Sequence, residues 1–202
     1  FQADSDYCRV LAWTNASVVQ WNKRIRGAIF GKKAPRFMPG ERLIATGACT
    51  RREVNLKNEY VENVILPSSG EVEVLEVHTE RGPVEYGTFQ AEVFDYWVIN
   101  AQDEDGAIKN FRVLAQKEED RLKGMLKDYA NRYEWDNYWG LRKAFHPLQY
   151  AYALTVHRSQ GSTFQRVFLD LRNLLRNRKP HERNKLLYTA ATRASEQMIV
   201  LQ

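Results

Sequence analysis

The chain has 202 residues, of which 44% are hydrophobic and 12% aromatic, so it is long enough to bury the core of one or two globular domains. Thirty Lys and Arg against 25 Asp and Glu give a formal net charge of +5, which suits a polyanionic partner without requiring one. Cys8 and Cys49 form no C-x-x-C pair, and no apolar run approaches the roughly 18 residues that cross a bilayer. These features argue against a disulfide framework, a metal site and a membrane partner, and we expect a cytoplasmic, nucleoid-associated protein.

The first predicted elements are a strand, a turn and a helix. Residues 7–13 form a short apolar run suited to a buried strand, and residues 14–17 are of the types that cap helices. Side chains that suit a buried helix face then recur at helical spacing, at Val18, Asn22, Ile25 and Ile29. Prolines at positions 35 and 39 end this unit.

The next segment, residues 39–115, is rich in short β-type runs, which cover residues 41–48, 71–78, 84–93 and 108–114. Within residues 72–77 the alternation of apolar side chains slips by one position, which indicates a β-bulge. The sequence Asp-Glu-Asp-Gly at residues 103–106 is typical of a hairpin turn. We therefore predict that residues 39–115 form a small β domain inserted into another fold.

Helical spacing returns after residue 117, and strands and helices then alternate along the rest of the chain. The predicted elements are two helices over 117–129 and 135–146, strands at 150–154, 167–169 and 197–201, and a helix at 184–194. This alternation on both sides of the insert predicts an α/β domain with a parallel sheet, formed by residues 1–38 and 116–202. We expect Trp135 and Trp139 in its core, and the alternative is that this aromatic helix stacks on the bases of a single strand.

One candidate site is the polar loop from Leu154 to Phe164. Thr155 can cap a short helical turn from which His157 and Gln160 project, and Gly161 permits a backbone reversal that exposes N–H groups to an anion. The alternative is a capped turn whose histidine only satisfies local hydrogen bonds.

A second candidate is Arg193, which follows small residues in the last predicted helix. A guanidinium held there suits an arginine finger that stabilises a transferring phosphoryl group, although a solvated surface charge has the same sequence pattern. Basic residues from Arg172 to Lys185 either follow a nucleic-acid backbone or form a solvated loop. No G-x-x-x-x-G-K-[ST] segment occurs, so we expect a part of a larger enzyme that does not hydrolyse ATP alone.

Three segments resemble motifs of superfamily 1 helicases. Cys8 to Asn22 is similar to motif IV, Leu154 to Phe164 to motif V, and Leu187 to Ala194 to motif VI. The resemblance is strongest to the 5′-to-3′ branch, superfamily 1B, which includes the phage Dda helicase and the RecD subunit of exodeoxyribonuclease V. It implies a RecA-like, P-loop NTPase-type domain without a P-loop, interrupted at residues 39–115 by an SH3-like β-barrel, the domain 2B of that branch.

The resemblance also implies a function: the chain would be the C-terminal motor half of an ATP-dependent DNA helicase. Arg193 would be the finger, and Gln160, Gly161 and Ser162 would lie beside the nucleotide. The single-stranded DNA contacts would be Thr14, Asn15, Thr155, His157 and Arg158. ATP with Mg²⁺ would be held mainly by an N-terminal RecA-like domain of the same protein, and subunits of a recombination complex are further implied partners. The alternative is a non-catalytic nucleic-acid-binding or assembly module with a degenerate helicase fold.

Overall fold

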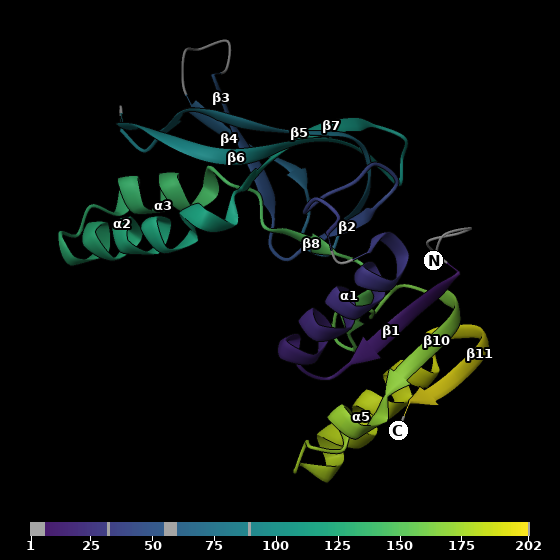
Figure 1. Ribbon diagram of the computed structural model, residues 1–202. Coiled ribbons are helices and arrows are strands. Elements are labelled where there is room, and N and C mark those ends of the chain that lie inside the picture. Colours follow the sequence, from purple (N-terminus) through teal and green to yellow (C-terminus); the bar gives the residue numbers. More distant parts are fainter. Residues whose placement is uncertain (1–6, 32, 55–59, 89, 202) are drawn as a thin grey trace. The chain divides into compact units, whose positions relative to one another are not determined.

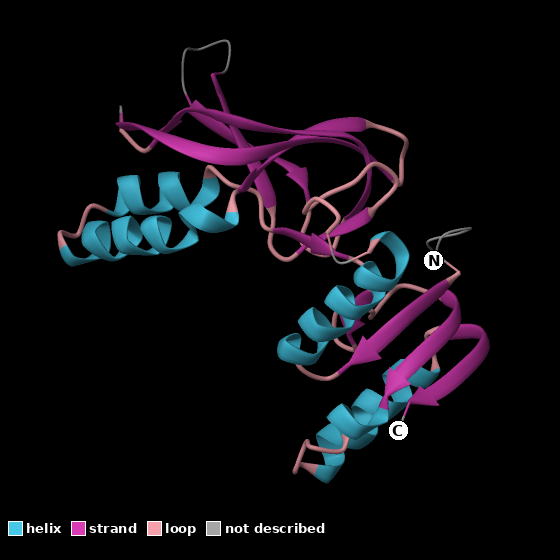
Figure 2. Ribbon diagram, viewed as in Figure 1, coloured by secondary structure: helices cyan, strands magenta, loops and turns pink. Residues whose placement is uncertain are grey.

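The computed structural model describes residues 7–31, 33–54, 60–88 and 90–201. The chain divides into two compact units, and we describe each by itself (Figures 1 and 2). Unit 1 consists of Phe1–Arg36 and Tyr150–Gln202, and unit 2 is Phe37–Gln149. Among the described residues, no helix is long and apolar enough to cross a membrane, and no group of three or more His, Cys, Asp or Glu could hold a metal ion.

Unit 1 contains a four-stranded parallel sheet, which confirms the predicted α/β class. The strands are β1 (Cys8–Ala12), β9 (Ala153–Thr155), β10 (Phe164–Asp170) and β11 (Ala194–Leu201), in the order β11-β10-β1-β9. All residues of β1 and β9 are buried, as expected for strands that helices cover on both faces.

Two long helices cover the faces of this sheet. Helix α1 (Asn15–Phe30) packs through Val18 on Val10, Ala12 and Ala153, and helix α5 (Pro180–Ala191) contacts β10 and β11 (Figure 1). The short α4 (Leu171–Leu174) connects β10 to the segment before α5. After β1, the chain of unit 1 forms its next strand, β9, on one side of β1 in the sheet. After β10, the next strand, β11, lies on the opposite side of the sheet. The connections therefore diverge between β1 and β10, which is the position where open parallel sheets bind ligands.

Unit 2 is built on antiparallel strands. Its larger sheet has the order β7-β6-β5-β2-β8, and the separate hairpin pairs β3 with β4. The bounds are β2 (Arg42–Ala45), β3 (Cys49–Val54), β4 (Tyr60–Leu66), β5 (Glu71–Tyr86), β6 (Gln90–Asp103), β7 (Ile108–Leu114) and β8 (Leu148–Tyr150). The register of β5 against β6 shifts between Val74 and Glu76, which confirms the predicted bulge, and the predicted turn at 103–106 joins β6 to β7.

The expected closed SH3-like barrel is not what the described residues form. Strands β3 and β4 pair only with each other, so they do not close the larger sheet. Strands β5 and β6 extend over 16 and 14 residues and carry the β ribbon beyond the length that a small barrel uses. The insert is therefore β-rich, as predicted, but its main sheet is open.

Two helices, α2 (Glu119–Asn131) and α3 (Trp135–Lys143), pack against the long hairpin of β5 and β6. A 3₁₀ turn at Gln116–Glu118 precedes them. Their apolar side chains share a core with the hairpin that includes Val84, Phe94 and Leu141. Unit 2 consequently extends to Gln149, past residue 115 at which the sequence patterns place the end of the insert.

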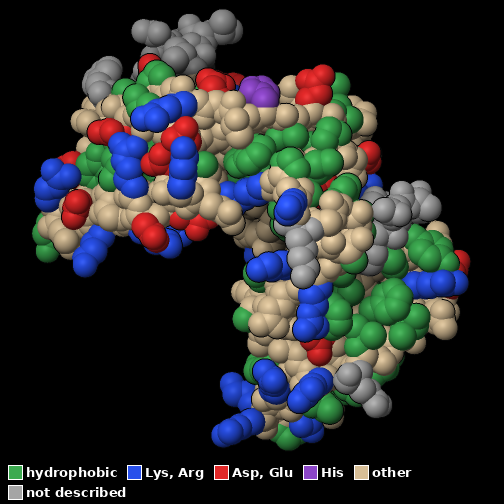
Figure 3. Space-filling view, in the orientation of Figure 1, with side chains coloured by type: hydrophobic (Ala, Val, Ile, Leu, Met, Phe, Trp, Pro, Cys, Tyr) green, Lys and Arg blue, Asp and Glu red, His purple; other side chains and the backbone are tan. Residues whose placement is uncertain are grey.

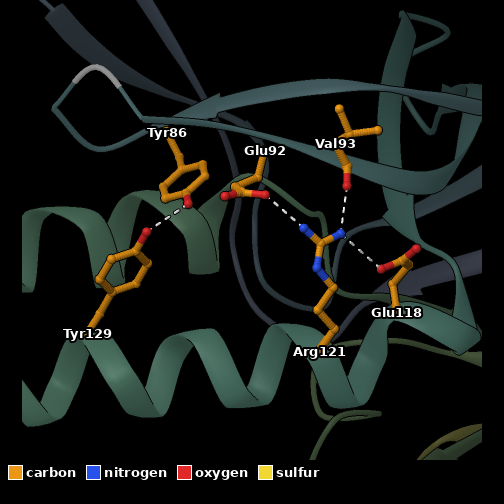
Figure 4. A network of polar contacts seen from close by, with 6 residues as sticks. All are labelled: Tyr86, Glu92, Val93, Glu118, Arg121 and Tyr129. Carbon is orange, nitrogen blue, oxygen red and sulfur yellow. Dashed lines mark hydrogen bonds and ion pairs between the residues drawn. The ribbon is translucent and has the colours of Figure 1, made fainter.

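Polar contacts hold α2 to the hairpin (Figure 4). The guanidinium of Arg121 donates to the Glu92 carboxylate at 2.7 Å, to the Val93 carbonyl at 2.6 Å and to Glu118 at 3.4 Å. Deeper in the interface, the hydroxyls of Tyr86 and Tyr129 form a 2.8 Å hydrogen bond, and burial is the first cause that raises the pKa of Tyr86. The Arg121 contacts are exposed, whereas the buried tyrosine hydrogen bond satisfies two hydroxyls that the packing of helix on sheet would otherwise leave without partners.

Helix α3 approaches the turn of the hairpin through two glycines. A Cβ added to Gly140 would lie 2.2 Å from the backbone nitrogen of Gly87, and Gly87 itself has a φ of +55°. No side chain fits between the two backbones, so this contact requires glycine at position 140.

The prediction that Trp135 and Trp139 lie in the core is wrong. Each is 49% exposed, and Tyr133 is 77% exposed. The apolar spacing of α3 did identify a helix, but Leu141 and not the tryptophans is its fully buried residue.

Candidate functional site

The start of α1 lies at the carboxyl edge of the parallel sheet, directly after β1. Thr14 is the N-cap, and its Oγ1 accepts a 3.3 Å hydrogen bond from the Ser17 backbone N–H. Asn15 and Ala16 are exposed. Because the first N–H groups of a helix have no partner within it, this end presents donors that suit a phosphate or another anion.

Asn173, which the sequence patterns did not single out, holds this helix start in place. Its Oδ1 accepts hydrogen bonds from the backbone N–H groups of Trp13 at 2.8 Å and Thr14 at 3.0 Å, and its Nδ2 donates to Thr14 Oγ1 at 3.1 Å. Asn173 is buried and lies in α4, just after the carboxyl end of β10. One side chain therefore connects the carboxyl ends of β1 and β10, the two strands between which the sheet connections diverge.

Asp170 adds a second tie at the same edge. Its Oδ2 accepts from Ser17 Oγ and from Trp21 Nε1, each at 2.8 Å, and its Oδ1 accepts from the Asn173 N–H at 2.9 Å. Burial opposes ionisation of this carboxyl group, but the hydrogen bonds outweigh it and hold the pKa of Asp170 below its ordinary value. The sequence signal for this pair was Asp170 at a strand end with Asn173 three residues later. Many ordinary capped turns have the same pattern, so it does not by itself indicate a site.

The loop of residues 155–163 begins at the same edge and ends at the opposite one. Thr155 is level with Ala12 at the carboxyl edge, whereas Phe164 is level with Ala194 at the amino edge. Six residue steps of β10 separate the two edges, which corresponds to roughly 20 Å. The predicted contacts therefore fall into two groups: Thr14, Asn15 and Thr155 lie at the carboxyl edge, and Gly161 and Ser162 lie toward the amino edge.

Within this loop, the predicted capping is confirmed. Thr155 Oγ1 accepts from the Arg158 N–H at 3.3 Å, and the buried Ser159 donates from its Oγ to the Val156 carbonyl at 2.8 Å. Gly161 has a φ of +94°, which confirms the predicted backbone reversal. Thr155 is buried, Arg158 is half-buried, and His157 and Gln160 are exposed.

Arg193 lies in the turn that follows α5, because the helix ends at Ala191 and not at residue 194 as predicted. Its Nη1 donates to the Ser162 carbonyl at 3.0 Å, its Nε to the Thr189 carbonyl at 3.3 Å, and its Nη2 to Thr192 Oγ1 at 3.1 Å. The guanidinium is therefore bound to the end of the polar loop. Arg193 and Ser162, which are 31 residues apart in sequence, meet at the amino edge.

A cavity of about 530 Å³ lies between the polar loop and α5. From the loop it is lined by His157 and Gln160, and from the helix by His181, Lys185 and Tyr188 among others. The sequence did not predict that these three helix residues line a cavity. Helical spacing shows which residues of α5 share a face, but not which loop lies opposite that face. Their imidazole, ammonium and phenol groups add hydrogen-bond donors to a cavity that the two loop residues already line.

Basic side chains gather over α4 and the beginning of α5, where Figure 3 shows Lys and Arg at one end of unit 1. Arg172, Arg176, Arg178, Lys179 and Lys185 are exposed, and Arg183 is half-buried. This end of unit 1 therefore presents positive charge beside the cavity.

Residues 150–201 match the family model of the UvrD-like helicase C-terminal domain. Over 65 residues the chain is 38% identical to an uncharacterized protein of Acanthamoeba polyphaga mimivirus, a match that covers 32% of this chain and 13% of that protein. The matched family segment contains the polar loop, α5 and Arg193.

Solved helicase structures are similar at low identity. A Pif1 helicase from Candida albicans aligns with a TM-score of 0.48 and 15% identity, over 97% of this chain and 45% of that one. A Pif1 helicase from Bacteroides, solved in complex with ADP-AlF3 and ssDNA, aligns with a TM-score of 0.48 and 13% identity, over 100% of this chain and 42% of that one. The chain thus spans less than half the length of either helicase.

Proposed function

We propose that this chain is the C-terminal motor half of an ATP-dependent 5′-to-3′ DNA helicase of superfamily 1B, of the Dda and RecD kind. The observation that carries the proposal is the hydrogen bond from Arg193 to the Ser162 carbonyl of the polar loop. Both residues lie inside the segment that matches a helicase C-terminal domain. One end of the loop thus meets a candidate finger, and its other end lies beside the helix N-terminus at Thr14.

The proposed role of Arg193 is to stabilise the charge that develops on a transferring γ-phosphate. Its three hydrogen bonds go to neutral oxygens, and a guanidinium bonds more strongly to a charged phosphate oxygen than to a neutral carbonyl. ATP with Mg²⁺ supplies the phosphoryl group when bound, and an N-terminal RecA-like domain of the same protein would hold most of it. This chain contains no phosphate-cradling loop and would not hydrolyse ATP unaided.

The loop offers a path between nucleotide and DNA. If Arg193 turns toward a phosphate, its hydrogen bond to the Ser162 carbonyl is lost, and this end of the loop, with Gly161 and the exposed Gln160, can then move. The other end of the loop carries Thr155 and His157, which we place beside single-stranded DNA. We expect Thr14 and Asn15 to bind a backbone phosphate through the helix N-terminus, with Arg158 as a further contact.

The test is single-strand-stimulated ATP turnover of the full-length protein that contains this chain. Arg193→Ala should lower turnover by about three to five orders of magnitude while nucleotide binding is retained, because the finger acts on the transition state. Arg193→Lys keeps the charge but loses the planar fork, and we expect it to remain strongly impaired. Arg24→Ala is the matched control, since it removes an exposed arginine of the same unit that has no proposed role.

Unchanged turnover in Arg193→Ala would remove this residue from the active site. Absence of turnover in the wild-type full-length protein, with salt-sensitive DNA binding that nucleotide does not affect, would instead favour the non-catalytic module. Assembly with recombination-complex subunits and a cytoplasmic, nucleoid-associated location belong to the same proposal and would be tested by co-purification from cells.

A further inference from the structure

Unit 2 has a polar cavity of its own, which the roles proposed above do not use. It measures about 620 Å³ and lies between the β3–β4 hairpin, the turn of the β5–β6 hairpin and helix α3. Four cationic side chains line it, Arg51, Arg52, Arg112 and Lys143. All of its lining residues belong to unit 2, so the cavity is complete within that unit.

Three carboxylates line this cavity, and two of them, Glu62 and Asp136, are already engaged; Glu85 is the third. Glu62 accepts from Lys143 at 2.6 Å, and this hydrogen bond is the first cause that lowers the pKa of Glu62. Asp136 accepts a hydrogen bond from the Thr88 hydroxyl.

Arg51 donates from one nitrogen to the Asn110 carbonyl at 2.9 Å, and a guanidinium has five N–H donors. Arg52 donates to the Gly87 carbonyl at 2.7 Å. Four cationic side chains against three carboxylates leave the lining with a small net positive charge, which favours an anionic ligand.

A row of aromatic rings leads away from the same cavity, in which Tyr133, Trp135 and Trp139 are exposed and Tyr138 is half-buried. Trp139 lines the cavity and contacts Tyr138 with ring centroids 5.0 Å apart, Tyr138 contacts Trp135 at 5.8 Å, and Trp135 contacts Tyr133 at 6.4 Å. The guanidinium of Arg142 lies 5.6 Å from the centroid of the Trp139 ring. Half of the Trp139 surface remains exposed, which leaves ring area for another planar group.

We propose that unit 2 carries its own binding surface for single-stranded nucleic acid, in which phosphates contact Arg51, Arg52 and Lys143 and a base stacks on Trp139. Positive charge beside exposed aromatic rings is the combination that proteins use to bind single strands without sequence preference. A duplex buries the faces of its bases, so it could use the cations but not the tryptophan. An acidic peptide would likewise use the cations and gain little from the row of rings.

This surface is separate from the contacts proposed in unit 1. It does not depend on Arg193 or on ATP, and the whole 202-residue chain can be tested for it directly. The probe is a fluorescently labelled oligodeoxythymidylate of roughly 16 nucleotides, and its anisotropy is measured over a range of salt concentrations. Tryptophan fluorescence gives a second readout, because stacking of a base on Trp139 should quench it.

Trp139→Ala should weaken binding by roughly 5- to 100-fold, and Trp139→Phe should restore part of that loss. Arg51→Ala should lower the slope of log K against log salt by about 0.7, as expected for one lost phosphate contact on a single strand. Lys127→Ala is the matched control, because it removes an exposed lysine of α2 that does not line the cavity. Circular dichroism would establish that each variant is folded.

Three outcomes would overturn the proposal. The first is unchanged affinity in both Trp139→Ala and Arg51→Ala while Arg158→Ala in unit 1 weakens binding, which would leave only the unit 1 contacts. The second is equal binding of duplex and single strand with no effect of Trp139→Ala. The third is competition by polyglutamate at the same concentration as by the oligonucleotide, which would identify an acidic protein as the partner.

Discussion

The two units place their candidate sites by different means. In unit 1 the polar residues follow strand ends in short stretches of sequence, at 14–15 and 155–163, and a parallel sheet brings such ends to shared edges. In unit 2 the cavity takes its residues from strands and a helix that lie far apart along the chain. A local motif can therefore predict the first site, whereas the second exists only after tertiary packing.

The units also differ in what holds their helices. Unit 1 fixes the start of α1 with the polar side chains of Asn173 and Asp170. Unit 2 fixes α3 by backbone contact between Gly140 and Gly87 and by the apolar core around Leu141. Substitutions at these positions should have effects of different size and kind, which makes the contrast testable.

The largest effect is expected from Gly140→Ala. The added methyl group would overlap the backbone of Gly87, which cannot rotate away as a side chain could, so α3 must move off the hairpin. We expect a loss of roughly 3 kcal/mol in the free energy of unfolding, measured by urea denaturation.

Gly124→Ala is the matched control for this prediction. Gly124 is exposed in α2 and has no atom within 4 Å of an added Cβ, so alanine should stabilise the helix by about 0.5–1 kcal/mol. Equal effects of the two substitutions would show that the glycine contact does not determine how α3 packs.

The next largest effect is expected from Asn173→Ala in unit 1. The substitution leaves the N–H groups of Trp13 and Thr14 without their acceptor at a partly buried position. We expect a loss of about 2 kcal/mol in unfolding free energy, together with faster hydrogen exchange of both amides. Asn184→Ala, an exposed asparagine of α5, should change neither quantity. Unaltered exchange at Thr14 in Asn173→Ala would contradict the proposed tie.

Sequence patterns predicted the parallel α/β class, the bulge near Leu75 and the reversal at Gly161, because each depends on local spacing or on one backbone conformation. They placed Trp135 and Trp139 in the core, because a helical pattern shows which residues share a face but not whether anything covers it. The SH3-like barrel was implied by the family resemblance, and strand patterns do not reveal that β3 and β4 pair only with each other.

For the candidate site, the patterns singled out Arg193 and the polar loop, whose roles stay predictions, but did not predict the contact between them. The bond from Arg193 to Ser162 joins residues 31 positions apart, and no spacing rule predicts it. Asn173 and the cavity residues His181 and Tyr188 of α5 were missed for the same reason. Their contribution depends on which strand or loop lies opposite them, and that information is tertiary.

The smallest predicted effect is a pH dependence specific to unit 2. His146 is buried, its Nδ1 accepts from the Arg112 N–H at 2.8 Å, and its Nε2 lies 3.1 Å from the Thr50 carbonyl. The neutral ring with its proton on Nε2 satisfies both partners, whereas protonation would set two donors against each other at Nδ1. Burial lowers the pKa of His146 below its ordinary 6.5, and the charges of Arg51 and Arg112 act in the same direction.

Because the folded state disfavours the protonated ring, the contribution of His146 to stability is complete above pH 6.5 and is lost progressively as the pH falls below it. The unfolding free energy of the wild type should therefore decrease between about pH 7.5 and about pH 5.5, and that of His146→Gln should decrease less. Asp170 of unit 1, whose pKa is also lowered, loses its contribution only at a pH below its ordinary 3.8, so this group should not add to the change. The same pH dependence in wild type and His146→Gln would show that the titrating group lies elsewhere, and would remove this difference between the two units.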